Sequence, residues 1–286
     1  METRQIVEHD GADLSYWLSR VVGAKHTLVM LHGVASNHTR WSEFVSTTSL
    51  TSSWNLLTLD LRGHGDSMFH GRINRRRWVA DLRAITEKEA LAPVVLLGHS
   101  LGAEIALDYA ARHPHEVSGL ILIDPVFHQN LHGLLGWVRR LQYLFWIPVG
   151  FLWLLHSLGI RRRQYPPRDL NALDEKTRET LSDIPQMTIA DLYMNPLADL
   201  SYIPFTNYLQ DLLAVVRPVP VLEKINQPVL VLMSGGSSLS DRRHNEEQIQ
   251  RMPNVTIRIV DCDHWPLTEQ PDTVRDMIDA WCQAHQ

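Results

Sequence analysis

The sequence predicts an α/β fold in which helices cover both faces of a mostly parallel sheet and a helical cap is inserted into the chain. The first observation is a series of short runs rich in Val, Leu and Ile, separated by longer helix-like segments. The second is a break between Val126 and about Leu222, where helical patterns and prolines occur without a convincing strand. This break is too long for a plain loop. We therefore expect a core domain of residues 1–125 and 223–286 and a cap of residues 126–222.

Length and composition agree with this fold class. A chain of 286 residues can form one large α/β domain with a sizeable core. With 44% hydrophobic residues, 21% charged residues and a net charge of -5, it carries no basic field that would attract nucleic acid. Cys262 and Cys282 are too few for a disulfide framework and lack a metal-binding spacing. The first residues lack a basic region followed by an apolar run, so we expect no signal peptide and a cytoplasmic protein.

The strands are predicted in order along the chain. Residues 6–9 and 14–18 form an antiparallel edge hairpin that turns at "HDGAD". The parallel strands are expected at "TLVMLHG", "NLLTLD", "PVVLLGHS", "LILIDP", "PVLVLM" and "VTIRIV". Helices are expected directly after Ser100 and from about Pro271. Because the carboxyl ends of parallel strands lie at one edge of a sheet, a site is expected there.

The strongest motif lies where the third of these parallel strands ends. Gly98-His99-Ser100-Leu101-Gly102 is a G-x-S-x-G pattern between an apolar strand and an apolar helix. Its glycines permit a tight turn that holds Ser100 exposed in a strained backbone conformation, and a helix N-terminus favours developing negative charge. We predict that Ser100 is a nucleophile.

A nucleophilic serine needs a general base, because a free hydroxyl is barely nucleophilic at neutral pH. Among fifteen histidines, His264 follows the strand "VTIRIV" and precedes the C-terminal helix, at the edge of the sheet where α/β sites form. We predict that His264 is the base. The backbone amides of Val34, after His32-Gly33, and of Leu101, after the serine, are expected to bind a tetrahedral oxyanion.

One further turn is read as structural. "DLRGHGDS" combines glycines with interleaved charges, which suggests a fixed turn below the site. We expect Asp60, Arg62 and His64 to stabilise this turn and not to take part in chemistry.

These motifs, in this order, resemble the α/β-hydrolase superfamily, and the resemblance covers nearly the whole chain outside the cap. It implies a Ser-His-acid triad, with Leu101 and Val34 as the oxyanion hole. The family commonly carries its acid in a Gly-x-x-Asp turn after the strand "PVLVLM", but here that position falls on Ser238 or Leu239. Asp124, in "LILIDPV", is favoured as the acid because some members use that position, notably a branch resembling small esterases and thioesterases. Asp241 is the alternative.

The resemblance also narrows the reaction. Similar enzymes that cleave carbon–halogen bonds or epoxides have an aspartate where Ser100 stands, so acyl transfer to water is expected, without a metal or organic cofactor. We expect a carboxylester hydrolase that acts on a small-molecule ester with an apolar acyl chain. An acyl thioesterase, a lysophospholipase or monoacylglycerol lipase, and a carbon–carbon bond hydrolase remain alternatives. A non-catalytic binding protein of the same fold is disfavoured, because both Ser100 and His264 are present.

The start of the predicted cap suggests how the protein reaches an apolar substrate. Residues 131–163 carry Trp137, Trp146 and Trp153 among many leucines, hold no acidic residue, and are flanked by Arg139, Arg140 and Arg161 to Arg163. One interpretation is an amphiphilic lid that rests on anionic lipid. The other is a pair of helices buried against the main domain. A membrane span is disfavoured, because Pro148, Gly150, Gln142 and His156 interrupt the run.

Overall fold

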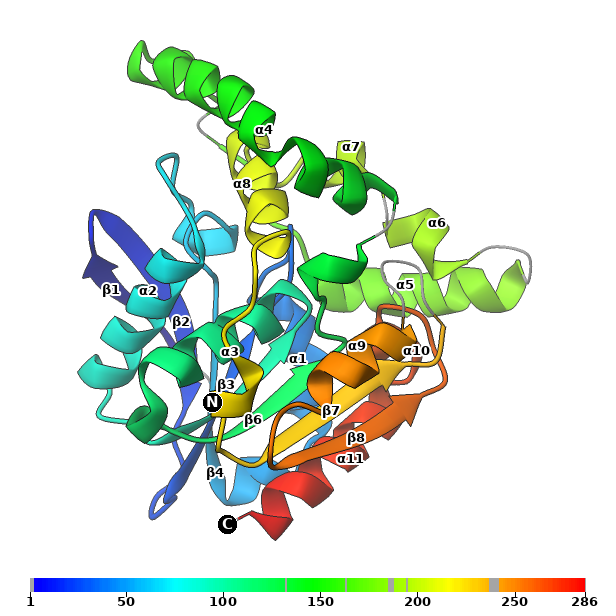
Figure 1. Cartoon of the computed structure of the whole chain (residues 1–286). Coiled ribbons are helices and arrows are strands. Elements are labelled where there is room, and N and C mark those ends of the chain that lie inside the picture. Colours follow the sequence, from blue (N-terminus) through cyan, green and yellow to red (C-terminus); the bar gives the residue numbers. More distant parts are fainter. Residues whose placement is uncertain are drawn as a thin grey trace.

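The computed structural model describes residues 3–131, 133–162, 164–184, 188–193, 195–236 and 242–285. Within these residues one sheet of eight strands runs through the molecule in the order β1-β2-β4-β3-β5-β6-β7-β8 (Figure 1). Its strands are β1 (Thr3–His9), β2 (Ala12–Ser19), β3 (His26–Leu31), β4 (Trp54–Leu59), β5 (Val94–His99), β6 (Val117–Ile123), β7 (Val229–Ser234) and β8 (Val255–Val260). Every strand predicted from the sequence is therefore present.

The direction of pairing also follows the prediction. Strands β1 and β2 form an antiparallel hairpin, and β2 pairs antiparallel with β4. From β4 to β8 all neighbours are parallel, with Val29 of β3 opposite both Leu57 of β4 and Leu96 of β5. The carboxyl ends of β3, β5, β6, β7 and β8 thus lie at one edge of the sheet.

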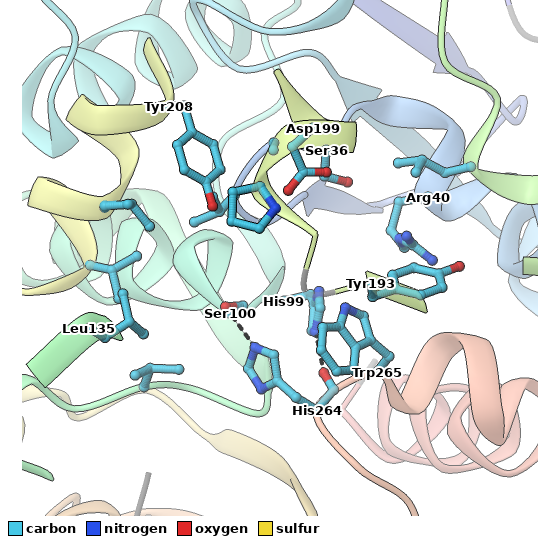
Figure 2. Close-up of a pocket in the computed structure, with 18 of the residues that line it drawn as sticks. Ser36, Arg40, His99, Ser100, Leu135, Tyr193, Asp199, Tyr208, His264 and Trp265 are labelled. Carbon is cyan, nitrogen blue, oxygen red and sulfur yellow. Dashed lines mark hydrogen bonds between the residues drawn. The ribbon is translucent and has the colours of Figure 1, made fainter. Parts of the chain in front are cut away.

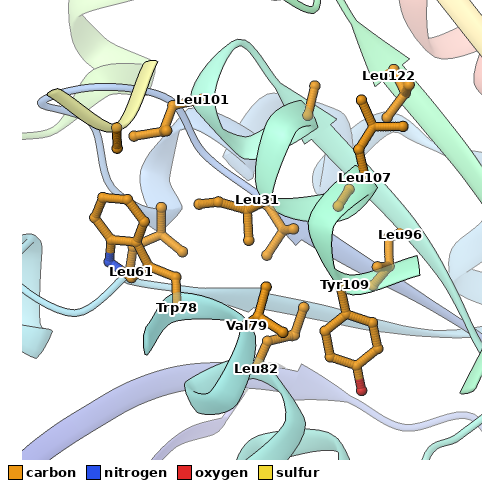
Figure 3. Close-up of a cluster of buried hydrophobic side chains, with 14 of the residues drawn as sticks. Leu31, Leu61, Trp78, Val79, Leu82, Leu96, Leu101, Leu107, Tyr109 and Leu122 are labelled. Carbon is orange, nitrogen blue, oxygen red and sulfur yellow. The ribbon is translucent and has the colours of Figure 1, made fainter. Parts of the chain in front are cut away.

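Alternate residues of the strands enter two separate hydrophobic clusters. Val29, Leu31 and Leu96 belong to one cluster, whereas Leu28, Met30 and Leu97 belong to the other. Such alternation is what a pleated strand produces when both faces of the sheet are buried. Figure 3 shows the first cluster, in which Trp78 and Leu82 of one helix and Leu107 and Tyr109 of another pack around Leu31.

Helices cover each of the two faces. Among the helices that contribute to the first cluster are α2 (Arg75–Lys88), α3 (Leu101–Arg112) and α9 (Arg242–Ile249). Those that contribute to the second are α1 (Ser42–Thr47), α10 (Pro266–Glu269) and α11 (Pro271–Ala284). Short 3₁₀ turns are η1 (His38–Trp41), η2 (Ser49–Ser52), η3 (Gly65–Ser67), η4 (Pro114–Glu116), η5 (His128–Asn130) and η6 (Leu222–Lys224). The doubly covered sheet is the fold class expected from the sequence.

Between β6 and β7 the chain leaves the sheet and forms a set of helices. They are α4 (Gly133–Ser157), α5 (Leu170–Asp183), α6 (Ile189–Tyr193), α7 (Pro196–Asp199) and α8 (Phe205–Val215). The division into a core of residues 1–125 and 223–286 and a cap of residues 126–222 stays a prediction. For brevity, we call the chain between β6 and β7 the inserted segment.

The pair of helices expected from the sequence is present within α4, as two helical segments that meet at a kink where the backbone of Leu141 leaves the helical conformation. Helix α4 packs beside α8 and projects beyond the rest of the molecule (Figure 1). Its Val138 and Val149 are buried, whereas Tyr143 and Phe151 are exposed. The interpretation that this pair is simply buried against the main domain is therefore wrong for its exposed side. In the part of the chain that the structure describes, no helix is long and apolar enough to cross a membrane.

Candidate active site

Ser100 occupies the turn between β5 and α3, in the setting that the sequence predicted. Its backbone has φ 52° and ψ −118°, a conformation that is strained for a residue with a side chain. The turn is tight because its glycines allow close contact. A Cβ atom on Gly98 would lie 2.4 Å from the carbonyl of Gly102, and one on Gly102 would lie 2.2 Å from the carbonyl oxygen of Leu31. The turn therefore holds Ser100 at the N-terminus of α3.

His264 lies within hydrogen-bonding distance of the serine. It belongs to the loop between β8 and α10, and its Nε2 atom is 3.0 Å from the Ser100 hydroxyl (Figure 2). In this arrangement the hydroxyl donates to the unprotonated Nε2 of the neutral imidazole. His264 is buried, with 5% of its surface exposed, so this hydrogen bond has little competition from water. The arrangement is the one that a general base requires.

Asp124 lies on the other side of the same imidazole. It directly follows β6, has φ 45°, and accepts a hydrogen bond from Nδ1 of His264 through its Oδ2 atom. Its Oδ1 atom accepts from the amide of Ser234 at 3.1 Å and from the Ser234 hydroxyl at 2.9 Å. Burial alone would raise the pKa of Asp124, but the charge interaction and hydrogen bond with His264, together with Ser234, hold this pKa below its usual value. The carboxylate is therefore ionised beside the imidazole.

The alternative acid, Asp241, lies outside the described residues, as do Ser238 and Leu239. The sequence thus named three residues, Ser100, His264 and Asp124, that the fold brings together from the ends of three strands.

His99 is a site residue that the sequence analysis did not identify. Its Nε2–H donates to the backbone carbonyl of His264 at 3.0 Å, which ties the loop after β8 to the turn after β5. Burial, together with the nearby His264, lowers the pKa of His99 to about 3, so it stays neutral. Its place within the G-x-S-x-G motif could have pointed to this residue, but the motif accepts any residue type at this position.

The two amides predicted to bind an oxyanion have the required settings. Leu101 is the first residue of α3, so its amide has no acceptor within the helix. Val34 lies in the loop after β3 and lines the same cavity as Ser100. Among the described residues, neither amide has a hydrogen-bond acceptor in the protein.

The inserted segment holds the loop that carries Val34. Ala35, the next residue, has φ 49°. Its amide donates to Asp211 of α8 at 3.4 Å, and its carbonyl accepts from Arg168 at 3.0 Å. Asp211 also accepts a hydrogen bond from His64 at 2.8 Å. Neither Asp211 nor Arg168 was identified from the sequence, because the separation of 176 residues between Ala35 and Asp211 leaves no local pattern.

The turn after β4 has the structural contacts we expected. Asp60 accepts hydrogen bonds from the amides of His38 and Asp66, both at 2.7 Å. Arg62 forms an ion pair with Asp81, with Nε 2.8 Å from the carboxylate. With His64 bound to Asp211, each of the three predicted residues holds a neighbouring segment.

A cavity of about 230 Å³ opens onto the serine and the histidine. Figure 2 shows Leu135 and Tyr208 on one side of Ser100 and Arg40, Tyr193 and Trp265 on the other. Its apolar wall comes mostly from the inserted segment: Val126, Leu135, Leu170, Leu212 and Val215. Among the described residues, no group of three or more His, Cys, Asp or Glu side chains is arranged to hold a metal ion.

Both arginines of this cavity are paired with carboxylates. Arg40 lies 2.6 Å from Oδ1 of the buried Asp174 and donates to Thr268 at 3.0 Å. Arg168 lies 2.7 Å from Asp199. The polar part of the wall therefore carries neutralised charges, and Arg40 also joins the inserted segment to the helix that follows His264.

Comparison with known proteins agrees with this geometry. Residues 26–271 match the family described as "alpha/beta hydrolase fold". A pimeloyl-[acyl-carrier protein] methyl ester esterase of Aromatoleum aromaticum is 28% identical over 88% of this chain and 96% of its own length. The sn-1-specific diacylglycerol lipase ABHD11 of Mus musculus is 22% identical over 93% of this chain and 83% of its own.

A solved structure of Est816, described as an N-acyl homoserine lactone degrading enzyme, superposes with a TM-score of 0.71 at 18% identity, covering 97% of this chain and all of the other. This likeness extends the agreement in fold to nearly every residue. The family match spans the sheet from β3 onward, the turn that holds Ser100 and the loop that holds His264. The chain therefore belongs to the α/β-hydrolase fold family and is a hydrolase.

Proposed function

We propose that this hydrolase is a serine carboxylester hydrolase that cleaves esters with an apolar acyl chain through an acyl-enzyme. The observation that carries the proposal is the line of hydrogen bonds from Ser100 through His264 to Asp124, which opens into a cavity with an apolar wall. The names of two relatives, a methyl ester esterase and a diacylglycerol lipase, describe cleavage of carboxylic esters and support the same class.

Acylation follows from the positions of these groups. The Ser100 oxygen attacks the ester carbonyl carbon while Nε2 of His264 takes the hydroxyl proton. Asp124 keeps the other nitrogen of the imidazole protonated and stabilises the imidazolium that forms. The carbonyl oxygen becomes an oxyanion that accepts hydrogen bonds from the amides of Val34 and Leu101.

Collapse of this intermediate completes the first half of the reaction. The bond between the carbonyl carbon and the alkoxy oxygen breaks, and His264 gives its proton to the leaving alcohol. In the second half, a water molecule attacks the acyl-enzyme with His264 again as base, which releases the carboxylic acid and restores the Ser100 hydroxyl.

The cavity supports an uncharged, apolar acyl group. Its leucines and valines provide an apolar surface on which each buried methylene group of an acyl chain stabilises binding by about 0.8 kcal/mol. Because Arg40 and Arg168 already pair with Asp174 and Asp199, the described residues that line the cavity include no unpaired arginine for a substrate carboxylate. The preferred substrate is therefore an ester whose acyl chain ends without charge.

The serine is tested by substitution and by covalent labelling. We expect Ser100→Ala to lower kcat by a factor on the order of a million, the cost of losing the nucleophile of a comparable triad. A fluorophosphonate probe should label the wild type and not the variant. A panel of p-nitrophenyl esters, acyl thioesters and monoacylglycerols then distinguishes the ester from the thioester leaving group. Turnover retained by a pure, folded Ser100→Ala preparation would refute the proposal.

A further inference from the structure

Helix α4 exposes a row of large apolar side chains on one face. The row consists of Leu144, Ile147, Phe151 and Leu154 of the helix and of Leu158 in the turn directly after it, and we call it the outer stripe. The four helical residues follow one another at intervals of three and four, so they lie on one side of the helix. Their exposed fractions run from 56% to 67%. Apolar surface that is continuous to this degree is rare on monomers and marks a docking site.

The opposite side of α4 belongs to the body of the molecule. Val138 and Val149 are fully buried, and Phe145 and Trp146 pack against the first hydrophobic cluster. The guanidinium of Arg72 lies 5.7 Å from the ring centre of Trp146, which fixes this side further. The folded protein therefore presents the outer stripe away from itself.

The charges around the stripe identify what binds it. Arg139 and Arg140 precede it and Arg161 and Arg162 follow it, and all four are exposed. From Val126 to Arg168 the sequence contains no Asp or Glu. An apolar helix face with arginines at both ends complements an anionic lipid surface, where the apolar side chains enter the acyl boundary and the arginines contact the headgroups.

We propose that α4 docks this protein on anionic membrane surfaces through the outer stripe. Because Pro148 lies within the helix and one side of the helix is packed on the protein, the helix lies along the membrane surface and does not cross it. A projecting ridge of this kind fits the deformable interface of a bilayer (Figure 1).

Docking also bears on which substrate the enzyme reaches, and this step of the inference rests on the proposed function. Leu135, in the first turn of α4, lines the cavity that contains Ser100, so the helix that contacts lipid also forms part of the acyl-binding wall. Lipid esters held in the membrane would thus reach the cavity from the surface on which the enzyme rests.

The test measures binding to vesicles with the full chain. Vesicles of equimolar phosphatidylglycerol and phosphatidylcholine should sediment with the wild type at low salt, and salt should weaken the binding. Ile147→Glu/Phe151→Glu should lower the affinity for these vesicles at least tenfold, since two apolar anchors are lost and two negative charges are added that the anionic lipid repels. Val22→Glu, at a fully exposed apolar residue outside the outer stripe, is the control and should bind as the wild type does.

The electrostatic part is tested separately. Arg140→Gln and Arg161→Gln should each weaken binding to these vesicles by about fivefold, the contribution of one arginine near an anionic surface. Arg243→Gln, whose side chain is 91% exposed on α9, is the control and should change little. Pure phosphatidylcholine vesicles should bind the wild type more weakly than the anionic ones.

Several results would overturn the proposal. One is an absence of binding to anionic vesicles at low salt. Another is equal binding by the wild type and the Ile147→Glu/Phe151→Glu variant. A third is a stable dimer in analytical ultracentrifugation that this double substitution dissociates, because the stripe would then cover a second copy of the chain. Ser100→Ala should bind vesicles like the wild type, so a failure of docking is distinguishable from a failure of the proposed chemistry.

Discussion

At the scale of single residues, the proposed acid depends on two neighbouring strands. Asp124 follows β6, and both hydrogen bonds to its Oδ1 atom come from Ser234, the last residue of β7. The family commonly carries its acid after β7, but in this chain the end of β7 supplies a serine that donates two hydrogen bonds to the carboxylate directly after β6.

Exchange of this acid for its amide tests the assignment. Asp124→Asn should preserve the shape but favour the wrong imidazole tautomer, lowering kcat by about 10⁴ as in a comparable serine protease triad. Asp241→Asn is the matched control and should leave kcat near the wild-type value. Both variants need a check of thermal stability, because the loss of a buried hydrogen-bonded carboxylate can itself cost 1 kcal/mol or so. The reverse pattern would assign the acid to Asp241.

The site residues differ in whether the sequence around each of them identifies it. Ser100 could be predicted because a strand, a turn and a helix surround it within one motif, and His264 because it follows a strand at the same edge. The contributions of His99 and Ser234 could not, because each depends on a hydrogen bond to a residue more than a hundred positions away. Only the packed sheet places those partners together.

Two buried histidines make the protein sensitive to acid. Nδ1–H of His32 donates to the Gly33 carbonyl at 2.9 Å, and its Nε2 accepts from the Leu61 amide at 3.0 Å, an arrangement that only a neutral ring satisfies. Burial is the main reason that the pKa values of His32 and His99 fall to about 3, from 6.5 in an exposed imidazole. Between these values the unfolded chain binds more protons, so the free energy of unfolding falls as the pH falls.

The size of this effect can be measured by urea unfolding at pH 7 and pH 5. Each group lowers the free energy of unfolding by about 1.4 kcal/mol per pH unit below its unfolded pKa, or about 2 kcal/mol at pH 5. His99→Gln keeps a donor toward the His264 carbonyl but does not titrate, so its loss between the two pH values should be about 2 kcal/mol smaller. His115→Gln, at an exposed site, is the control. Equal pH dependence in wild type and His99→Gln would contradict the argument.

At the scale of elements, the contact between α3 and β3 positions the proposed nucleophile, Ser100. Gly102 of α3 lies against the backbone of Leu31 so closely that no side chain fits between them. This contact brings the first turn of α3, with the amide of Leu101, beside the loop that carries Val34. The second glycine of the motif therefore serves the proposed oxyanion hole as well as the turn.

A pair of glycine substitutions separates this role from helix propensity. Gly102→Ala should destabilise the protein by about 1–3 kcal/mol, as overpacking does, and should lower kcat because α3 shifts. Gly150→Ala, in α4, adds a Cβ that meets no atom within 4 Å apart from the helix's own neighbouring backbone, and should instead stabilise the protein by up to about 1 kcal/mol. Thermal unfolding and ester hydrolysis measure both variants. Unchanged stability and turnover in Gly102→Ala would mean that the contact is not needed.

The elements differ in how well the sequence predicted them. The six strands β3 to β8 could be predicted because the parallel strands of a covered sheet appear as short apolar runs between helices. The exposed side of α4 could not be predicted, because apolar residues occur all around it. Whether a residue such as Ile147 is buried or exposed then depends on how α4 packs on α8. The hydrophobic periodicity of the sequence does not reveal that packing.

At the scale of the whole molecule, the cavity belongs to two parts of the chain. The sheet supplies Ser100 and His264 from its edge, whereas the inserted segment supplies most of the apolar wall and holds Ala35 through Arg168 and Asp211. The same segment therefore bears on the proposed acyl recognition and on the loop that carries Val34. The volume of the cavity, about 230 Å³, is below the roughly 300–1,000 Å³ usual for ligand pockets.

This volume sets an expectation for acyl-chain length. Each methylene buried in the cavity is worth about 0.8 kcal/mol, so kcat/KM should rise about fourfold per carbon until the chain fills the available space, and then level off or fall. Leu135→Trp, which narrows the cavity, should move the optimum toward shorter chains. Leu144→Trp adds the same ring on the outer stripe of α4 and should leave the optimum unchanged. The measurement is kcat/KM for p-nitrophenyl esters of increasing length, with each variant first shown to unfold cooperatively. A flat profile in the wild type, or the same shift in both variants, would mean that acyl chains bind elsewhere, because only Leu135 of the two faces Ser100 across the cavity.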